Sequence, residues 1–369
     1  MSLTIGMIAP ISHPFPPPGY GPWERVCHDL TEGLVQLGHD VVVFAPAGSN
    51  TSGDLHPTVP MPLVEAAVND VPHDSRVWES AHIAAAVAES MRRRVDVVHS
   101  HLHVHALGYA PLMPMPLVTT LHGAAWDANH HMMLDAHRDQ PFVSLSDAER
   151  RFLPDLNYVA TVNNGIRLAD YPPAADPGTD LAFVGRMAPE KAPHLAIAVA
   201  NSAGLRLVLA GAIEAQHQSY FDDSVRPQLG PMIRYVGELP RHEVVQLLSA
   251  SGALIMPLLW DEPFGLVVIE SLAVGTPVVA WRRGAMPELI RHGETGFLVD
   301  DVQGAAAAVA TITQIDRARC RVAAETRFGH IDMARGYVEA YGRAIAQLIS
   351  ARTSDTGTVA TEIQVSETP

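Results

Sequence analysis

Lysine is almost absent from this sequence of 369 residues. Lysine and arginine together number 25, and only position 191 is a lysine, so every other one of these positive side chains is an arginine. Aspartate and glutamate number 40, and the formal net charge is −15 at pH 7. Because binding to phosphate backbones needs a basic surface, this balance excludes nucleic acid as a partner. It also disfavours contact with a membrane surface, although it leaves such contact open.

Cysteine is scarce as well. Cys27 and Cys320 lie far apart in the sequence and show no spacing typical of metal ligands, so we expect two reduced, buried thiols. Residues 1–10 lack the charged start and the long apolar stretch of a secretory signal. No uncharged run approaches the ~20 residues of a membrane span without prolines or polar breaks. We therefore expect a cytoplasmic protein.

Short, continuously apolar segments alternate with helical patterns along the whole chain. Uninterrupted apolar strands are typical of parallel sheets that are covered on both faces. We expect strands at residues 4–11, 41–46, 96–101, 116–122, 142–146 and 158–162, and then at 181–186, 205–211, 233–239, 253–258, 277–281 and 296–300. Helices are expected at residues 22–37, 76–94, 190–203, 241–251, 264–274, 303–316 and 331–351. This βαβ pattern occurs twice and predicts an α/β fold.

A linker divides the two series of strands. Residues 163–180 contain Asn-Gly, Pro-Pro and Pro-Gly pairs, which are typical of turns. We therefore expect two Rossmann-like, doubly wound domains, at residues 1–162 and 163–350, that face each other across a ligand-binding cleft. The last helix, about residues 331–350, could pack back on the first domain. Residues 351–369 lack apolar periodicity and are expected to be disordered.

The single lysine lies in the segment FVGRMAPEKAP, where a predicted strand ends and a helix follows. Arg186 and Lys191 both emerge at that strand end, and Glu190 is the only acid nearby in the sequence. Two cations so placed fit an anion with several oxygens, such as a diphosphate, whereas the plain alternative is a loop with two solvated charges. A slim ammonium can enter a phosphate pocket that would be too narrow for a guanidinium.

A second segment, WDEPFGLVVIESLAVGTPVVAW, places acids around a helix start. Gly265 precedes the helix, whose free backbone N–H groups can hold phosphate oxygens. Glu270 is the only charged residue from Pro263 to Trp281, and its helical neighbours are apolar. Such a carboxylate needs a partner, either the hydroxyls of a ligand or the backbone or a buried arginine. Glu262, in the loop before the helix, could face another part of the same ligand.

Histidines alternate in the run HSHLHVH. On one strand His99, His101, His103 and His105 would share a face and could form a metal cluster. The strand should end near His101, however, and no cysteine or spaced carboxylate accompanies the histidines, so we expect no metal site. His101 could line the cleft from the strand end, and the others are expected to be structural or exposed.

Several of these segments resemble one enzyme family. The E-x7-E spacing of EPFGLVVIE and the pattern GRMAPEK are similar to those of the retaining GT-B glycosyltransferases of family GT4. Further similar pieces are NNGI, YVGEL, GTPVVAW, GAMPELI and GETGFLV, with GHDVVVFAP, DVVHSH and TLHG matching more loosely in the first half. The resemblance extends from the first strand to about residue 350 and implies the GT-B fold.

The resemblance also implies roles for individual residues. Arg186 and Lys191 would neutralise the diphosphate of the sugar donor and the charge that develops on it as it leaves. Glu270 would bind the ribose, Glu262 the transferred sugar, and His122 would face that sugar near the reacting carbon. The remaining implied contacts are backbone N–H groups for sugar and phosphate at Phe264, Gly265 and Leu266, and base contacts at Val236, Gly237 and Leu239.

The implied reaction moves a hexosyl group from a UDP- or GDP-sugar to an acceptor hydroxyl with retention of configuration. Family members work without a metal, so no cofactor is expected, and the acceptor is expected to be a small molecule or a lipid. The alternatives are a non-catalytic sugar-nucleotide-binding protein and a GT-B sugar-nucleotide epimerase. The resemblance does not indicate the oligomeric state.

Three departures from the family pattern stand out. The usual Gly-Gly loop after the first strand is replaced by Gly19, Tyr20 and Gly21 in a proline-rich segment, and we keep a ligand role for Gly21. The glycine that commonly follows the lysine is Ala192, and LAGAIEA replaces a glycine-rich turn. None of these changes removes a side chain to which the resemblance assigns chemistry.

Overall fold

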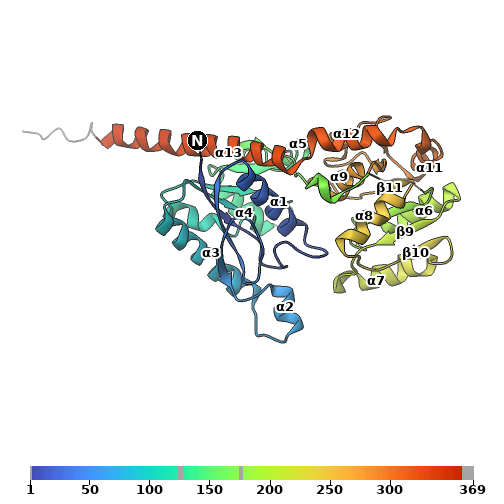
Figure 1. Cartoon of the computed structure of the whole chain (residues 1–369), viewed down its shortest axis with the longest axis horizontal. Coiled ribbons are helices and arrows are strands. Elements are labelled where there is room, and N and C mark those ends of the chain that lie inside the picture. Colours follow the sequence, from blue (N-terminus) through green and yellow to red (C-terminus); the bar gives the residue numbers. More distant parts are fainter. Residues whose placement is uncertain (1, 124–127, 174–177, 360–369) are drawn as a thin grey trace, which may run out of the picture.

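The structure is a computed structural model that describes residues 2–123, 128–173 and 178–359. Two parallel β-sheets lie side by side, each with helices on its faces (Figure 1). All pairings among the described strands of both sheets are parallel. This architecture confirms the predicted α/β fold with two Rossmann-like domains.

The first sheet has seven strands in the order β3-β2-β1-β4-β5-β6-β7. They are β1 (Thr4–Ile8), β2 (Asp40–Pro46), β3 (Asp54–Val59), β4 (Val97–Ser100), β5 (Leu117–Thr120), β6 (Phe142–Ser144) and β7 (Tyr158–Thr161). The helices of this part are α1 (Pro22–Gln36), α2 (Leu63–Val68), α3 (Ser75–Arg93), α4 (Ala128–Ala136) and α5 (Asp147–Arg150). Strand β3 was not predicted, because it contains Pro57 and lacks a continuous apolar run. It lies at the edge of the sheet, where proline is tolerated.

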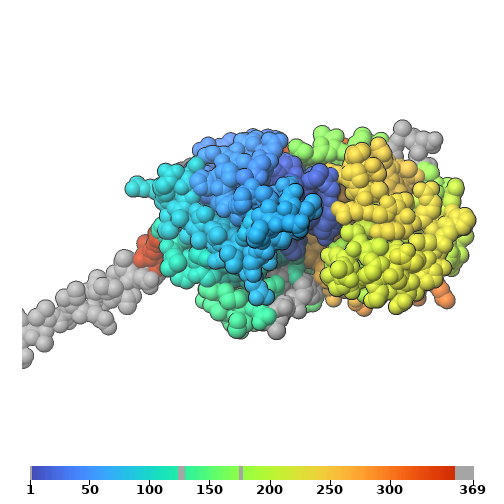
Figure 2. Space-filling model, turned by 90° about the horizontal axis from the view of Figure 1, so that it is seen from below, coloured from blue at the N-terminus to red at the C-terminus, as the bar shows by residue number. Residues whose placement is uncertain are grey.

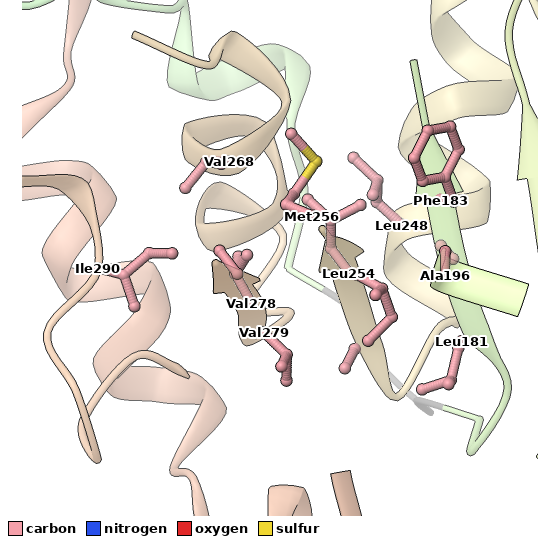
Figure 3. Close-up of a cluster of buried hydrophobic side chains, with 14 of the residues drawn as sticks. Leu181, Phe183, Ala196, Leu248, Leu254, Met256, Val268, Val278, Val279 and Ile290 are labelled. Atoms are coloured by element: carbon pink, nitrogen blue, oxygen red, sulfur yellow. The ribbon is translucent and has the colours of Figure 1, made fainter. Parts of the chain in front are cut away.

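The second sheet has six strands in the order β10-β9-β8-β11-β12-β13. They are β8 (Leu181–Val184), β9 (Leu207–Ala210), β10 (Ile233–Tyr235), β11 (Ala253–Met256), β12 (Val278–Trp281) and β13 (Gly296–Val299). The helices are α6 (Pro193–Ala203), α7 (Gln218–Tyr220), α8 (Arg241–Ala250), α9 (Leu266–Ala273), α10 (Met286–Leu289), α11 (Val302–Ala310) and α12 (Arg317–Arg327). Figure 3 shows part of its core, in which Leu181, Leu254 and Val278 of the strands lie near Leu248 of α8 and Val268 of α9.

The chain passes between the two sheets twice, and the two connections lie side by side. The backbone N–H of Ile166 donates to the carbonyl of Phe328 at 2.9 Å, and the N–H of His330 donates to the carbonyl of Ile166 at 3.0 Å. A side chain at Gly165 would put its Cβ 2.6 Å from the carbonyl oxygen of Gly329, so glycine is required for this close approach.

Helix α13 (His330–Val359) returns across the first sheet and packs against α1 (Figure 1). Its residues Ala334, Tyr337 and Tyr341 belong to the hydrophobic core beneath that sheet. The helix continues through residues 351–359, which belong to the tail for which the sequence predicts disorder. The rest of the predicted tail, 360–369, lies outside the described residues. No helix in the described part of the chain is both long and apolar enough to cross a bilayer.

Candidate active site

A cavity of about 550 Å³ lies where the two sheets face each other. Its walls come from the loop between β1 and α1, the end of β5, and the loops that follow β8, β10 and β11. In Figure 2 the dark-blue N-terminal residues lie between the blue-to-cyan lobe and the yellow lobe. A hydrogen bond joins the two lobes here: the backbone N–H of Arg241 donates to the carbonyl of Pro18 at 3.4 Å.

Most of the predicted site residues meet in this cavity. The predicted residues among those that line it are Gly21, His122, Arg186, Lys191, Leu239, Glu262, Phe264, Gly265, Leu266 and Glu270. Val236 and Gly237 do not line it. Their backbone groups are used in the sheet and its turns instead: Val236 donates to the carbonyl of Leu209 at 3.0 Å, and the carbonyl of Gly237 accepts from Gly211 at 2.8 Å.

The two cations at the end of β8 are each held by carboxylates. Arg186 donates to Glu214 at 2.7 Å and to Glu190 at 3.0 Å. Lys191 donates from Nζ to Oε2 of Glu262, and its Nζ lies 4.7 Å from the centre of the Trp260 ring. The ammonium therefore fits between a carboxylate and an aromatic face, a narrow setting that favours a point charge.

The backbone at Ala192 accounts for the glycine that commonly follows the lysine in the family that this sequence resembles. Ala192 is the N-cap of α6 and adopts φ 53° and ψ 52°, in the left-handed region. Only glycine enters that region without a steric penalty, which for other residues is about 1–2 kcal/mol. The turn is thus preserved in this chain despite the loss of the glycine.

Glu270 has a partner that the sequence did not reveal. The hydroxyl of Tyr171, from the linker between the domains, donates to Oε1 of Glu270 at 2.6 Å. Burial, followed by the nearby charge of Glu270, raises the pKa of Tyr171 well above its usual value, so the phenol keeps its proton. The guanidinium of Arg241 lies 4.8 Å from the centre of the Tyr171 ring. Tyr171 therefore holds the carboxylate of Glu270, which lines the cavity.

Two glycines allow the backbone to approach the cavity. Gly265 is the N-cap of α9 with φ 101°, and a Cβ there would lie 2.9 Å from Cε of Met286. Gly21 is the N-cap of α1 with φ 139°, and a Cβ there would lie 2.8 Å from Cβ of Pro17. The proline-rich segment thus packs directly on Gly21, and both helices direct their N-termini toward the cavity wall.

His122 follows β5 and is buried, with 7 % of its surface exposed. Its Nε2 lies 2.9 Å from Nδ1 of His101, and its ring stacks on Trp23 with 6.0 Å between centres. Burial and the neighbouring histidines lower the pKa of His122 well below its usual value. The prediction that His101 lines the cleft is wrong, because His101 is fully buried behind His122, where β4 already ends at Ser100.

The other histidines of the alternating run have separate surroundings. His103 packs its ring edge against Trp23 at 4.5 Å, and His105 forms an ion pair with Glu79 at 2.8 Å. Within the described residues, no group of three or more histidine, cysteine, aspartate or glutamate side chains has the arrangement of a metal site.

Glu149 is a further buried carboxyl group beside the site. It accepts hydrogen bonds from the N–H groups of Gly123 at 2.9 Å and Leu145 at 2.8 Å. Burial raises its pKa to about 8 despite these two bonds. It fixes the backbone that follows His122. Nothing in the sequence distinguished this acid from its neighbours, and nothing linked Tyr171 to Glu270. Trp260 could have been considered, because it begins a segment already singled out.

Comparison with known proteins gives the family. Residues 23–168 match the profile of Glycosyltransferase Family 4, and residues 172–327 match that of Glycosyl transferases group 1. The chain is 32 % identical to a glycogen synthase of Mycobacterium tuberculosis, over 82 % of this chain and 84 % of that protein. It is 27 % identical to a D-inositol 3-phosphate glycosyltransferase of Corynebacterium efficiens, over 87 % and 89 % of the two chains.

Solved structures agree with this assignment. AviGT4, a glycosyltransferase involved in avilamycin A biosynthesis, superimposes with a TM-score of 0.72 at 26 % identity, over 94 % of this chain and 98 % of that one. HepE of Anabaena, solved in complex with UDP and glucose, has the same fold, with a TM-score of 0.71 at 17 % identity over 93 % and 100 % of the chains. The chain belongs to the GT-B glycosyltransferases of family 4 and is a glycosyltransferase.

Proposed function

We propose that this glycosyltransferase moves a hexosyl group from a UDP- or GDP-sugar to an acceptor hydroxyl, with retention of configuration and without a metal. One observation carries the proposal: Arg186 and Lys191, the N-terminus of α9, and the carboxylates of Glu262 and Glu270 line a single cavity between the domains. The diphosphate of a nucleoside diphosphate sugar offers anionic oxygens to the two cations and to the helix N-terminus. Its hydroxyls can donate hydrogen bonds to the two carboxylates. The complexes of HepE with UDP and with UDP-glucose, and of a starch synthase with ADP, support a nucleotide-sugar donor.

In this proposal the second domain, residues 163–350, binds the donor. Arg186 and Lys191 bind the diphosphate, which displaces the carboxylates that form ion pairs with them in the structure. Glu270, oriented by Tyr171, accepts hydrogen bonds from the ribose hydroxyls, and Leu239 adjoins the base. Glu262, once released from Lys191, accepts hydrogen bonds from the transferred sugar.

Catalysis in this arrangement is mainly electrostatic. The bond between the anomeric carbon and the phosphate oxygen breaks, and its electron pair leaves with the nucleoside diphosphate. Arg186, Lys191 and the N-terminus of α9 stabilise that developing charge. The acceptor hydroxyl bonds to the anomeric carbon on the face that the phosphate leaves, and its proton passes to a phosphate oxygen. No carboxylate forms a covalent bond with the sugar.

The first domain, residues 1–162, binds the acceptor. Its loops line the other side of the cavity with Ser12, His13 and Trp23. We propose a small-molecule or lipid acceptor and a cytoplasmic location. The name of the Corynebacterium efficiens relative, a D-inositol 3-phosphate glycosyltransferase, supports a small polar acceptor.

The test is transfer itself. Purified protein with EDTA is incubated with UDP- and GDP-hexoses and a panel of inositol phosphates, sugar phosphates and lipids, and the released nucleoside diphosphate is measured. The account predicts release with one donor base and an α-linked product from an α-linked donor, read by the anomeric proton coupling. A β-linked product would refute retention, and a requirement for a divalent metal would refute the metal-free mechanism.

Removal of single side chains provides the matching test. Lys191→Ala and Glu270→Ala each delete a group that contacts the donor, so each should lower kcat/KM by about 100-fold or more. Both variants should keep the wild-type circular dichroism spectrum. The control is Glu294→Ala, an exposed carboxylate outside the cavity, which should leave activity unchanged. Wild-type turnover in either test variant would contradict the assignment.

A further inference from the structure

Three histidines stack behind the cavity wall, and only His122 has a place in the proposed reaction. The rings of His99 and His101 lie 4.2 Å apart, and those of His101 and His122 lie 5.2 Å apart. His99 is anchored by two hydrogen bonds, to Tyr341 at 2.8 Å and to Thr120 at 2.7 Å. The row therefore has a fixed inner end and an outer end at the cavity.

The central contact joins His101 to His122. Nδ1 of His101 lies 2.9 Å from Nε2 of His122, a normal hydrogen-bond length. Nε2 of His101 is buried and has no hydrogen-bond partner among the described residues. His122 lines the cavity, and no described residue hydrogen-bonds its other ring nitrogen, Nδ1.

Both imidazoles are neutral at neutral pH. Burial is the main cause that lowers the pKa of His101 and of His122, and the adjacent histidines lower both further. A neutral imidazole carries one N–H and one bare nitrogen, so the bond between the two rings can run in only two directions. If His122 donates, His101 must carry its proton on the buried Nε2, where the N–H has no acceptor.

If His101 donates instead, the cost of burying an N–H group without an acceptor is avoided. An orphaned buried N–H is rarer in proteins than an under-used acceptor, because a donor stripped of its partner loses a strong interaction with water. With the proton of His101 on Nδ1, the buried Nε2 is a bare nitrogen and no donor is left without an acceptor. This arrangement also leaves His122 with its proton on Nδ1.

We propose that His101 is a positioning residue that donates a hydrogen bond from Nδ1 to Nε2 of His122 and so fixes His122 as the Nδ1–H tautomer. His122 is then a hydrogen-bond donor to an oxygen of the bound sugar and cannot act as a base. The functional part of this inference rests on the proposed function, because it takes the ligand at His122 to be the donor sugar. The tautomer itself does not depend on any ligand.

Nitrogen NMR on protein labelled with ¹⁵N-histidine tests the tautomer directly. The His122 signals are identified by their loss in His122→Gln. The proposal predicts a protonated Nδ1 and an unprotonated Nε2 for His122, and a mixture of both tautomers in His101→Leu. A protonated Nε2 on His122 in the wild type would overturn the proposal.

Kinetics test the consequence for function. His101→Leu should lower kcat by about 10- to 100-fold, the range found when a group that orients a metal-bound histidine is removed. Its Kd for UDP should remain that of the wild type, because UDP has no sugar for His122 to contact. His101→Asn, whose amide nitrogen can replace Nδ1 as a donor, should recover most of the lost rate.

A matched control separates orientation from burial. His82 is fully buried in the same domain, bonded to the carbonyl of Ala9 and to Thr58, and it is not in contact with His122. His82→Leu should lower stability but leave kcat within about twofold of the wild type. Equal loss of kcat in His82→Leu and His101→Leu, or no recovery in His101→Asn, would overturn the positioning role. If the wild type neither binds a nucleoside diphosphate nor transfers sugar, the proposed function fails, and the NMR result still decides the tautomer.

Discussion

At the scale of single residues, the one lysine lies in a space that is too narrow for an arginine. Lys191 lies between the carboxylate of Glu262 and the ring of Trp260, and 15 % of its side chain is exposed. A planar guanidinium is wider than an ammonium and needs a larger space. In a chain whose other basic residues apart from histidine are arginines, this geometry accounts for the retained lysine.

Lys191→Arg therefore tests shape rather than charge. We expect kcat/KM to fall by about 100-fold, because the wider group displaces Glu262 or Trp260 and misplaces the positive charge. Steady-state kinetics with the active donor measure this effect. Arg206→Lys, at an exposed position with 62 % of its side chain accessible, is the control for the reverse exchange and should have wild-type activity. Full activity of Lys191→Arg would show that the pocket accepts either cation.

Glu214 forms an ion pair with Arg186 in the structure, and this ion pair must break before a diphosphate can bind to Arg186. Glu214→Gln removes this competing charge, so we expect the Kd for UDP or GDP to decrease by about threefold to tenfold. Calorimetric titration measures the change. Glu294→Gln, next to Arg291 at 3.9 Å and outside the cavity, makes the same change of net charge and should leave Kd unaltered. Weaker binding in Glu214→Gln would show that Glu214 assists the ligand.

At the scale of helices and strands, the packing of α13 on α1 depends on a glycine. A Cβ at Gly33 would lie 2.8 Å from the carbonyl oxygen of His330 and 2.9 Å from Cβ of Ala334. The two helices therefore approach closely just where α13 begins. This contact holds the returning helix against the first domain.

Two glycine-to-alanine exchanges should have opposite effects. Gly33→Ala overpacks the contact between α1 and α13, and we expect the free energy of unfolding to fall by about 1–3 kcal/mol. Gly342→Ala lies in α13 with no atom within 4 Å of the added Cβ, and the better helix propensity of alanine should raise that free energy by up to about 1 kcal/mol. Urea unfolding measures both values. Stabilisation by Gly33→Ala would mean that the helices do not pack as described.

The sequence predicted the elements with regular patterns and missed those without them. Twelve apolar runs became strands because buried parallel strands need apolar side chains on both faces. Strand β3, with Pro57 at an exposed edge, has no such pattern. In the site, Lys191 and Glu270 could be predicted because their motifs are local, but Tyr171, 99 residues from Glu270, could not, since only the folded linker brings them together.

At the scale of the whole molecule, buried histidines connect stability to pH. Burial lowers the pKa of His82 to about 4 and the pKa values of His99 and His103 to about 3. In the unfolded chain a histidine takes up its proton near pH 6.5. Between these pH values the unfolded state binds more protons than the folded state, so acid favours unfolding.

We therefore expect the free energy of unfolding to decrease as the pH falls from about 6.5 towards 4. Each such histidine contributes a slope of up to about 1.4 kcal/mol per pH unit in this interval. Urea midpoints at pH 7.5, 6.0 and 5.0 measure the trend. His82→Leu should flatten it, because this variant removes one of the titrating groups. Equal midpoints at the three pH values would contradict the burial of these imidazoles in neutral form.

The central claim is that Arg186 and Lys191 hold the diphosphate of a nucleotide donor in the cavity between the two domains. Calorimetric titration of the protein with UDP and with GDP, in buffer containing EDTA, tests it most directly. We expect that one of the two binds with one site per chain and that Lys191→Ala weakens this binding by at least about tenfold. Absence of binding to both nucleotides, or the same affinity in Lys191→Ala as in the wild type, would contradict it.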